Sequence, residues 1–423
     1  PFAPLRNWVV GAFLDAGYVF ASNRPDNHVN RGIVTAPRTG ELTVSYAAAY
    51  VRHDASEREP LALELALQIG PAATALVAGE PQPGGDASRF AGPNVWQHLG
   101  RANVGGRIPR AGTELSAGLF NTPIGYWSFW PKDNWSYSTP WHLNAVPYVL
   151  MGGRIVQPAG ERVMLHAWIV NGYQTYADAN DVPSYMFGLT VAPTASLSLG
   201  HFDYFGPEDV DIAARSWRWL SDTWLFFERD RFGIAGVFDA MRERLTHVPG
   251  QPVALQLAGE VSARVRLLDA REGRVKWYLA GRGEAFWDRD GRMFGVRQLL
   301  GSGLVGTDLR LWDYLLVRLE YRYDRTDNQQ GFFYRKSAVR DDDTGLGREQ
   351  HAVYFVLTGM FEHWFAARPK RRQSRATRSA IARPPERVGA VTLTTKPPPA
   401  SRTSTCAPAT ASGSDALVIA PAS

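Results

Sequence analysis

The chain has 423 residues, of which 45% are hydrophobic and 12% aromatic, with 40 glycines and 28 prolines. This composition allows one large domain or a few ordinary ones, and no apolar run reaches the ~18 residues of a transmembrane helix. The formal charge of +5 does not describe the main part of the chain. Ten basic and two acidic residues follow Phe365, so residues 1–365 contain 36 basic and 39 acidic residues and are slightly acidic. The single cysteine, Cys406, excludes a disulfide framework and a cysteine metal site. No signal-peptide pattern is visible at Pro1.

Alternation of apolar and polar side chains is the main pattern of residues 1–365. In 253–267 the odd positions are apolar or glycine, and many even positions are charged. The same period of two appears in 61–69, 275–287 and 315–323. A period of two places each set on one face of a strand, so the pattern predicts an all-β protein.

Sixteen strands are predicted in this region. They lie near residues 9–22, 40–53, 60–70, 95–108, 113–120, 146–157, 162–172, 183–193, 195–205, 213–228, 231–244, 253–268, 274–287, 295–309, 312–324 and 350–365. Short turns alternate with long polar loops between them, which is typical of an up-and-down antiparallel barrel. An even number of strands puts both ends of the barrel on the short-turn side.

The charged faces of the strands are expected to point into the barrel. Sixteen strands enclose a lumen too wide for side chains to fill, so the charged face meets water and the apolar face meets lipid. The expected pore-lining residues are Glu260, Arg264, Arg266, Lys276, Arg282, Glu284, Arg318, Glu320 and Arg322. Their excess of basic residues predicts a slight preference for anions, unless neighbouring Arg and Glu pair across strands and cancel the field.

Two tryptophans support an apolar face in lipid. Trp277 and Trp287 share the apolar face of one predicted strand, ten residues apart. At ~3.3 Å per residue and ~40° of tilt they are separated by roughly 25 Å along the barrel axis. That distance matches the spacing of the two aromatic girdles of an outer-membrane barrel.

The third long loop is unusually aromatic. Residues 119–154 contain a loop of roughly 25 residues, a length that is usually functional, and its prolines forbid a helix or a central strand. Its rings need a packing partner. Three of them either form a surface for sugars or attach the loop to the barrel wall: Trp127, Trp130 and Trp135. Together with Tyr126 they belong to the loop that is expected to narrow the pore.

Several motifs resemble the OmpL-like β-barrel porin-2 family of Gram-negative outer membranes. The resemblance covers most of 1–365, and it is strongest in residues 21–27, 121–138, 168–181, 192–208, 318–328 and 350–361. It implies an outer-membrane channel without enzymatic chemistry, whose third outer loop folds into the lumen. Lys132 and Asp133 at the loop tip and Arg154 on the next strand are then the expected narrowest point.

The end of the chain departs from the family pattern. Phe365 resembles the terminal aromatic residue by which the barrel assembly machinery recognises such proteins, but 58 residues follow it. Residues 366–423 are basic and then rich in Pro, Ser and Thr, which predicts disorder. An anionic-lipid or nucleic-acid patch is the alternative for the Arg-rich part, and no nucleic-acid partner is expected for the barrel.

The sequence thus predicts an outer-membrane porin for passive diffusion of small polar solutes or ions. The alternatives are an outer-membrane channel specific for a sugar or organic acid, and a secreted soluble β-rich protein that binds carbohydrate. No catalytic motif is visible, and the GxGxxG match at 301–306 is followed by strand rather than helix. No metal or cofactor is expected, because the acidic loop segments lack EF-hand spacing. Outer-membrane lipid and a homotrimer are the expected partners.

Overall fold

The computed structural model describes residues 7–77, 97–178, 180, 182–208, 216–246, 248–336 and 345–365. The tail 366–423 lies outside the described residues, so its disorder stays a prediction.

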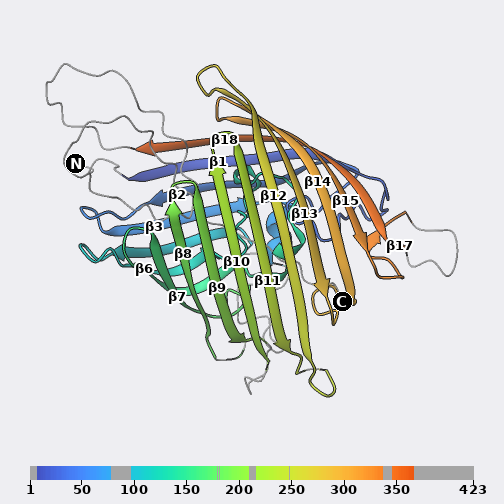
Figure 1. Ribbon diagram of the computed structural model, residues 1–423, viewed down its shortest axis with the longest axis horizontal. Helices are drawn as coiled ribbons and strands as arrows, with labels where there is room; N and C mark the ends of the chain where they lie inside the picture. Colours follow the sequence, from blue (N-terminus) through green and yellow to red (C-terminus); the bar gives the residue numbers. More distant parts are fainter. Residues whose placement is uncertain are drawn as a thin grey trace.

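A single closed antiparallel barrel of 16 strands contains nearly all of the described chain (Figure 1). Its strands are β1 (Trp8–Ala21), β2 (Leu42–His53), β3 (Leu61–Ile69), β4 (Leu99–Arg107), β5 (Glu114–Asn121), β6 (Val149–Pro158), β7 (Val163–Val170), β8 (Ser184–Thr194), β9 (Leu197–Pro207), β10 (Trp217–Arg229), β11 (Phe232–Arg244), β12 (Val253–Ala270), β13 (Val275–Asp288), β14 (Gln298–Leu311), β15 (Leu315–Thr326) and β18 (Glu349–Phe365). The remaining elements are a short helix, α1 (Pro71–Val77), two short 3-10 turns, η2 (Pro131–Asp133) and η3 (Trp141–Ala145), and a hairpin of β16 (Phe333–Tyr334) and β17 (Leu346–Gly347) inside the last long loop. The prediction of a sixteen-stranded up-and-down barrel is confirmed.

Closure of the barrel brings the first and last strands together. Trp8 of β1 pairs with Phe365 of β18, so both ends of the barrel lie at the edge where the short turns lie. The turn between β10 and β11 contains only two residues, and Asp230 adopts a positive φ of 52° there. Such turns match the right-handed twist of the flanking strands. The long loops gather at the opposite edge.

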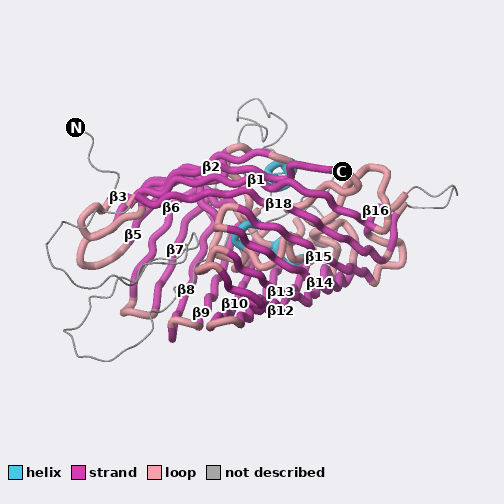
Figure 2. Tube along the Cα trace, turned by 90° about the horizontal axis from the view of Figure 1, so that it is seen from above, coloured by secondary structure: helices cyan, strands magenta, loops and turns pink. Residues whose placement is uncertain are grey.

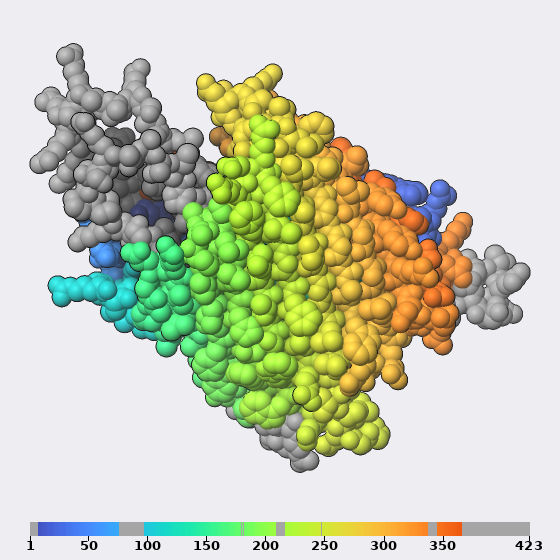
Figure 3. Space-filling view, in the orientation of Figure 1, coloured from blue at the N-terminus to red at the C-terminus, as the bar shows by residue number. Residues whose placement is uncertain are grey.

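The outer face of the barrel is apolar, as the alternation predicts. On β12 the inward Glu260 and Ser262 are buried, whereas Val261 between them points outward and is exposed. Trp277 and Trp287 also point outward, with 44% and 40% of their surface exposed. In the space-filling view the wall over β8–β15 is one continuous surface (Figure 3). None of the helices in the described residues is long and apolar enough to span a membrane.

The inner wall has two chemically different halves. On β5–β10 the inward side chains include many apolar or aromatic ones, such as Phe120, Trp168 and Phe202. On β12–β15 they include the charged residues that were expected to line a pore. Most inward side chains of both halves are buried, because the long loop between β5 and β6 fills much of the barrel. The expected charged, wet lumen therefore describes only one side of the wall.

Candidate functional site: the loop inside the barrel

Residues 122–148, which connect β5 to β6, fold into the barrel. Figure 2 shows short helical turns enclosed by the ring of strands. The two turns of this loop are Pro131–Asp133 and Trp141–Ala145. Both have proline at their start, where its missing N–H has no helical partner in any case. Almost every residue of the loop is buried.

The aromatic rings of the loop pack between the loop and the wall. Tyr126 stacks on Phe226 of β10 with ring centres 4.9 Å apart, and Trp135 contacts the same ring at 5.3 Å. Trp127 packs edge-on against Trp135 at 5.4 Å. All three loop rings are buried. They attach the loop to the wall, and none of them presents an exposed surface to a sugar.

A second aromatic contact holds the tip of the loop. Trp130 packs against Tyr50 of β2 with ring centres 4.8 Å apart and against Phe13 of β1 at 5.4 Å. On the other side, the guanidinium carbon of Arg101 lies 4.1 Å from the centre of the Trp130 ring. The Trp130 ring thus packs against aromatic rings of the wall and against the guanidinium of Arg101.

Arginines of the charged half bind carbonyl groups of the loop. Arg318 donates hydrogen bonds to the carbonyl oxygens of Pro131 and Asn134, both at 2.5 Å. Arg282 donates to the carbonyl oxygen of Ser138 at 3.0 Å, and Arg322 to that of Thr139 at 2.8 Å. An irregular buried loop leaves such groups without backbone partners, so the wall must supply them.

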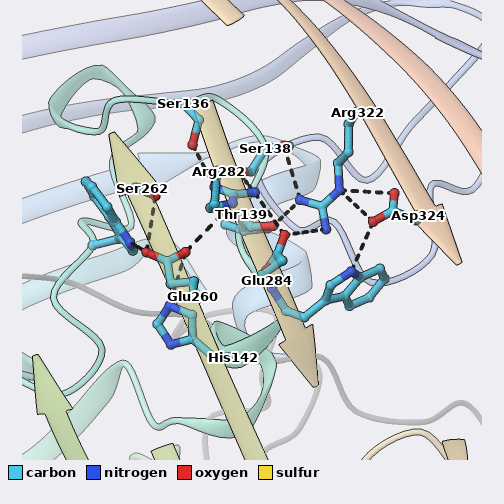
Figure 4. A network of polar contacts seen from close by, with 12 residues as sticks. Ser136, Ser138, Thr139, His142, Glu260, Ser262, Arg282, Glu284, Arg322 and Asp324 are labelled. Carbon is cyan, nitrogen blue, oxygen red and sulfur yellow. Dashed lines mark hydrogen bonds and ion pairs between the residues drawn. The ribbon is translucent and has the colours of Figure 1, made fainter. Parts of the chain in front are cut away.

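Carboxylates of the same half bind N–H groups of the loop. Glu320 accepts hydrogen bonds from the backbone N–H groups of Tyr137 at 2.7 Å and Ser138 at 3.1 Å. The indole N–H of Trp141 donates to Asp324 at 3.0 Å. Figure 4 shows Asp324 and Arg322 joined to Arg282 through the ion pairs of Glu284 with Arg282 and Arg322.

A histidine of the loop lies among wall carboxylates. His142 Nδ1 is 2.9 Å from Asp239 on β11, and its Nε2 is 3.8 Å from Glu260 on β12. Asp222, which faces Asp239 across β10 and β11, accepts a hydrogen bond from the N–H of Gly125 at 3.2 Å. Burial lowers the pKa of the imidazole of His142, although the nearby carboxylates act in the opposite direction.

Lys132 and Asp133, two of the three predicted constriction residues, pair with each other, and Arg154 lies on the strand that follows the loop. Lys132 forms an ion pair with Asp133 at 2.8 Å, and its backbone oxygen accepts a hydrogen bond from Arg310 of β14. Arg154 instead lies on β6, with its guanidinium carbon 4.6 Å from the ring centre of Phe120. In the described residues no recorded contact joins the loop tip to Arg154. Their joint role as the narrowest point stays a prediction.

The remaining predicted pore-lining cations lie near the short-turn edge. Arg266 pairs with Asp269 at 3.1 Å, and Lys276 lies 3.8 Å from Asp313. Arg264 pairs with Glu228 and lies between the rings of Trp135 and Tyr278. Of these pairs, Arg264–Glu228 joins two strands, Arg266–Asp269 lies within β12, and Asp313 lies in the turn between β14 and β15. The pairs neutralise these cations, although only one of them joins two strands as the sequence alternative required.

Sequence reasoning missed several inward charges. The missed residues are Arg101, Arg107, Arg218, Asp222, Asp239, Asp308, Arg310 and Asp324. All but Arg310 sit on the inward face of a predicted strand, so the same period of two, applied to every strand, would have found them. Arg310 was predicted to lie in a turn, whereas β14 extends to Leu311. Across the described part of the chain, no group of three or more His, Cys, Asp or Glu side chains is arranged to hold a metal ion.

Comparison with known proteins identifies this arrangement. The profile of the family described as "Putative beta-barrel porin-2, OmpL-like" matches residues 8–352. The chain belongs to this family. It is therefore an outer-membrane porin, and the loop 122–148 is its third outer loop. A comparison with curated proteins finds no match.

Solved porin structures share the fold of this porin at very low sequence identity. The outer-membrane channel DcaP of Acinetobacter baumannii aligns with a TM-score of 0.52 and 10% identity, over 85% of this chain and 100% of that one. The anion-selective porin from Comamonas acidovorans gives 0.51 and 10%, over 84% and 99%. The trimer form of OmpT from Vibrio cholerae gives 0.51 and 11%, over 84% and 99%. At this identity the similarity establishes the fold alone.

Proposed function

We propose that this porin passes small polar solutes and ions by passive diffusion beside its third loop, with no chemical step. The observation that carries the proposal is the position of loop 122–148, which runs inside the barrel and is held there by wall charges of both signs. A loop so placed narrows the route and leaves a low-conductance channel. Lys132, Asp133 and Arg154 remain our candidates for its narrowest point.

A slight preference for anions is part of the proposal. Among the inward-facing Lys and Arg of the described strands, all but Arg154 and Arg310 have a carboxylate within ion-pair distance. By contrast, the carboxylates of Asp222 and Glu320, for which no ion pair is recorded, are buried beneath the loop and accept hydrogen bonds from its backbone. The two unpaired cations, Arg154 and Arg310, are what supports a preference for anions.

Conductance of the full chain, refolded in detergent and inserted into a planar bilayer, tests both parts. We expect small ohmic current steps, and steps several-fold larger from a variant in which residues 126–146 are replaced by a short Gly-Ser turn. Reversal potentials in a KCl gradient should show weak anion preference. A heat-modifiable barrel that never conducts would refute the diffusion proposal, whereas cation preference in a conducting channel would refute only the selectivity.

The proposal also states where the barrel meets lipid, how it is recognised for assembly and how its copies associate. The outward Trp277 and Trp287 are placed at the two lipid interfaces, and Phe365, the last residue of β18, is the mark read by the barrel assembly machinery. A homotrimer is supported by the trimer form of the structurally similar OmpT. Cross-linking of the folded protein in outer-membrane vesicles should give a band of three protomers, and a band of one protomer alone would contradict it.

A further inference from the structure

Arg154 is unusual among the inward arginines of the barrel. It lies on β6 directly opposite Ser116 of β5 and Trp168 of β7. For the described residues, no hydrogen bond or ion pair is recorded for any of its guanidinium nitrogens, and the Nε atom is buried. Only aromatic rings contact the cation, with the ring centre of Phe120 at 4.6 Å and that of Trp168 at 5.4 Å from the guanidinium carbon.

Trp168 supplies a second donor at the same place. Only 4% of its surface is exposed, and its indole Nε1 is buried without a hydrogen-bond partner. A buried donor that is left unpaired destabilises the folded protein. Two neighbouring side chains that both present unpaired N–H groups therefore form a site that lacks only an acceptor.

Two carboxylates near Arg154 are ion-paired to other arginines. Arg101 pairs with Glu64 at 2.9 Å, and Arg107 pairs with Glu114 at 3.6 Å. Both carboxylates also attract Arg154 electrostatically, but within the described residues neither forms an ion pair with its guanidinium. The guanidinium therefore lacks a direct acceptor, and the site matches a small anion with at least two acceptor atoms.

We propose that Arg154 and Trp168 form a binding subsite for small monocarboxylates on the inner wall of this porin. The planar fork of an arginine matches the two oxygens of a carboxylate, and the indole N–H lies close enough to donate to one of them. Chloride offers a single centre and cannot use this geometry. The inference rests on the proposed function, because the ligand reaches the subsite through the lumen.

Acetate binding to the ¹⁵N-labelled full chain in detergent micelles tests the subsite without relying on conduction. The indole N–H resonance of Trp168 is assigned by its absence from the Trp168→Phe variant, which keeps an aromatic ring but removes the donor. We expect this resonance to shift in a saturable way with acetate and not with chloride at equal ionic strength. Arg154→Gln should raise the acetate dissociation constant at least ~10-fold, since a hydrogen bond to a charged group contributes about 1.5–3 kcal/mol.

Arg310→Gln is the matched control, because it removes the same unit of lumenal charge from the opposite wall. It should leave acetate binding within about twofold of the unsubstituted porin. An unresponsive Trp168 resonance, or equal weakening by both arginine variants, would overturn the subsite. In the bilayer, acetate should reduce the chloride current, and Trp168→Phe should weaken this block. If the protein does not conduct but its Trp168 resonance still shifts with acetate, the proposed conduction is refuted and the subsite stands. If the protein conducts but the resonance does not shift, the subsite is refuted and the proposed conduction stands.

Discussion

Substitution of Glu320 by glutamine should release the third loop while keeping the barrel intact. Glu320 is buried on β15 and accepts the backbone N–H groups of Tyr137 at 2.7 Å and Ser138 at 3.1 Å. The hydroxyl of Ser138 donates to it as well. A glutamine has the same shape, but its amide nitrogen would face one of these donors and its oxygen would carry no full charge.

The expected loss of free energy for loop docking follows from the two backbone hydrogen bonds that Glu320 accepts. Each bond to a charged group contributes about 1.5–3 kcal/mol, so weakening or losing both costs about 3 kcal/mol at the lower limit. A change of this size shifts the equilibrium between the docked and the released loop by about a hundredfold. The barrel itself should persist, because the backbone ladders of β15 with β14 and β18 do not depend on this side chain.

Single-channel recording measures this equilibrium as the fraction of time spent in a high-conductance state. Glu228→Gln is the control, because it removes the charge of a half-buried carboxylate that pairs with Arg264 of β12 near the short-turn edge. We expect Glu320→Gln to raise the high-conductance occupancy by one to two orders of magnitude and Glu228→Gln to leave it nearly unchanged. An occupancy for Glu320→Gln within about threefold of the unsubstituted porin, in a barrel that remains heat-modifiable, would refute the view that wall charges hold the loop.

Three further predictions concern the loop and the end of the barrel. Lowering the pH from about 7.5 to 5.5 should raise the high-conductance occupancy. Burial holds the pKa of His142 in the docked loop below its ordinary 6.5, so the docked loop loses stability as the pH falls through 6.5. His142→Gln should flatten the dependence of this occupancy on pH, and an unchanged slope would contradict the prediction. Trp130→Ala should reduce the free energy of unfolding by about 3–5 kcal/mol through the cavity it leaves, read from the denaturant midpoint, and a loss below about 1 kcal/mol would show that the ring is not a packing anchor. Phe365→Ala should slow insertion by purified assembly machinery without changing stability, and an equal rate of appearance of the heat-modifiable form would argue against recognition of that residue.

The strands could be predicted from the sequence because a period of two needs no knowledge of tertiary contacts. Every predicted barrel strand exists, and the errors fall mainly at the long-loop edge. There β4, β6 and β14 begin at Leu99, Val149 and Gln298, three to four residues later than predicted. Apolar residues of the loops, such as Val146 and Val296, extend the alternation beyond the last ladder bond, because they are buried inside the barrel rather than exposed to water.

The function of the individual wall charges could not be predicted in the same way. Arg318, Glu320 and Arg322 point inward as predicted, but they bind the loop instead of facing open water. Glu320 and Ser138 lie 182 residues apart in the chain, and no local pattern reports a contact of that separation. Trp168 was missed as a donor for a related reason. From sequence, an inward tryptophan is interpreted as a packing residue until the partners of its N–H are known.

The inner wall meets two needs of the loop. Its prolines prevent a helix or a strand, so its backbone groups cannot satisfy one another and must find partners elsewhere. The charged half, β12–β15, supplies many of those partners, and Asp222 of β10 accepts the N–H of Gly125. The rings pack against aromatic side chains of β10, β1 and β2. Most inward charge is thus used to hold the loop or is neutralised in pairs, and little of it is left to select ions. Selectivity then depends on the inward cations that have no carboxylate partner, Arg154 and Arg310, of which Arg310 also donates a hydrogen bond to the backbone oxygen of Lys132. Single substitutions at these two positions should change selectivity more than any exchange within the paired network.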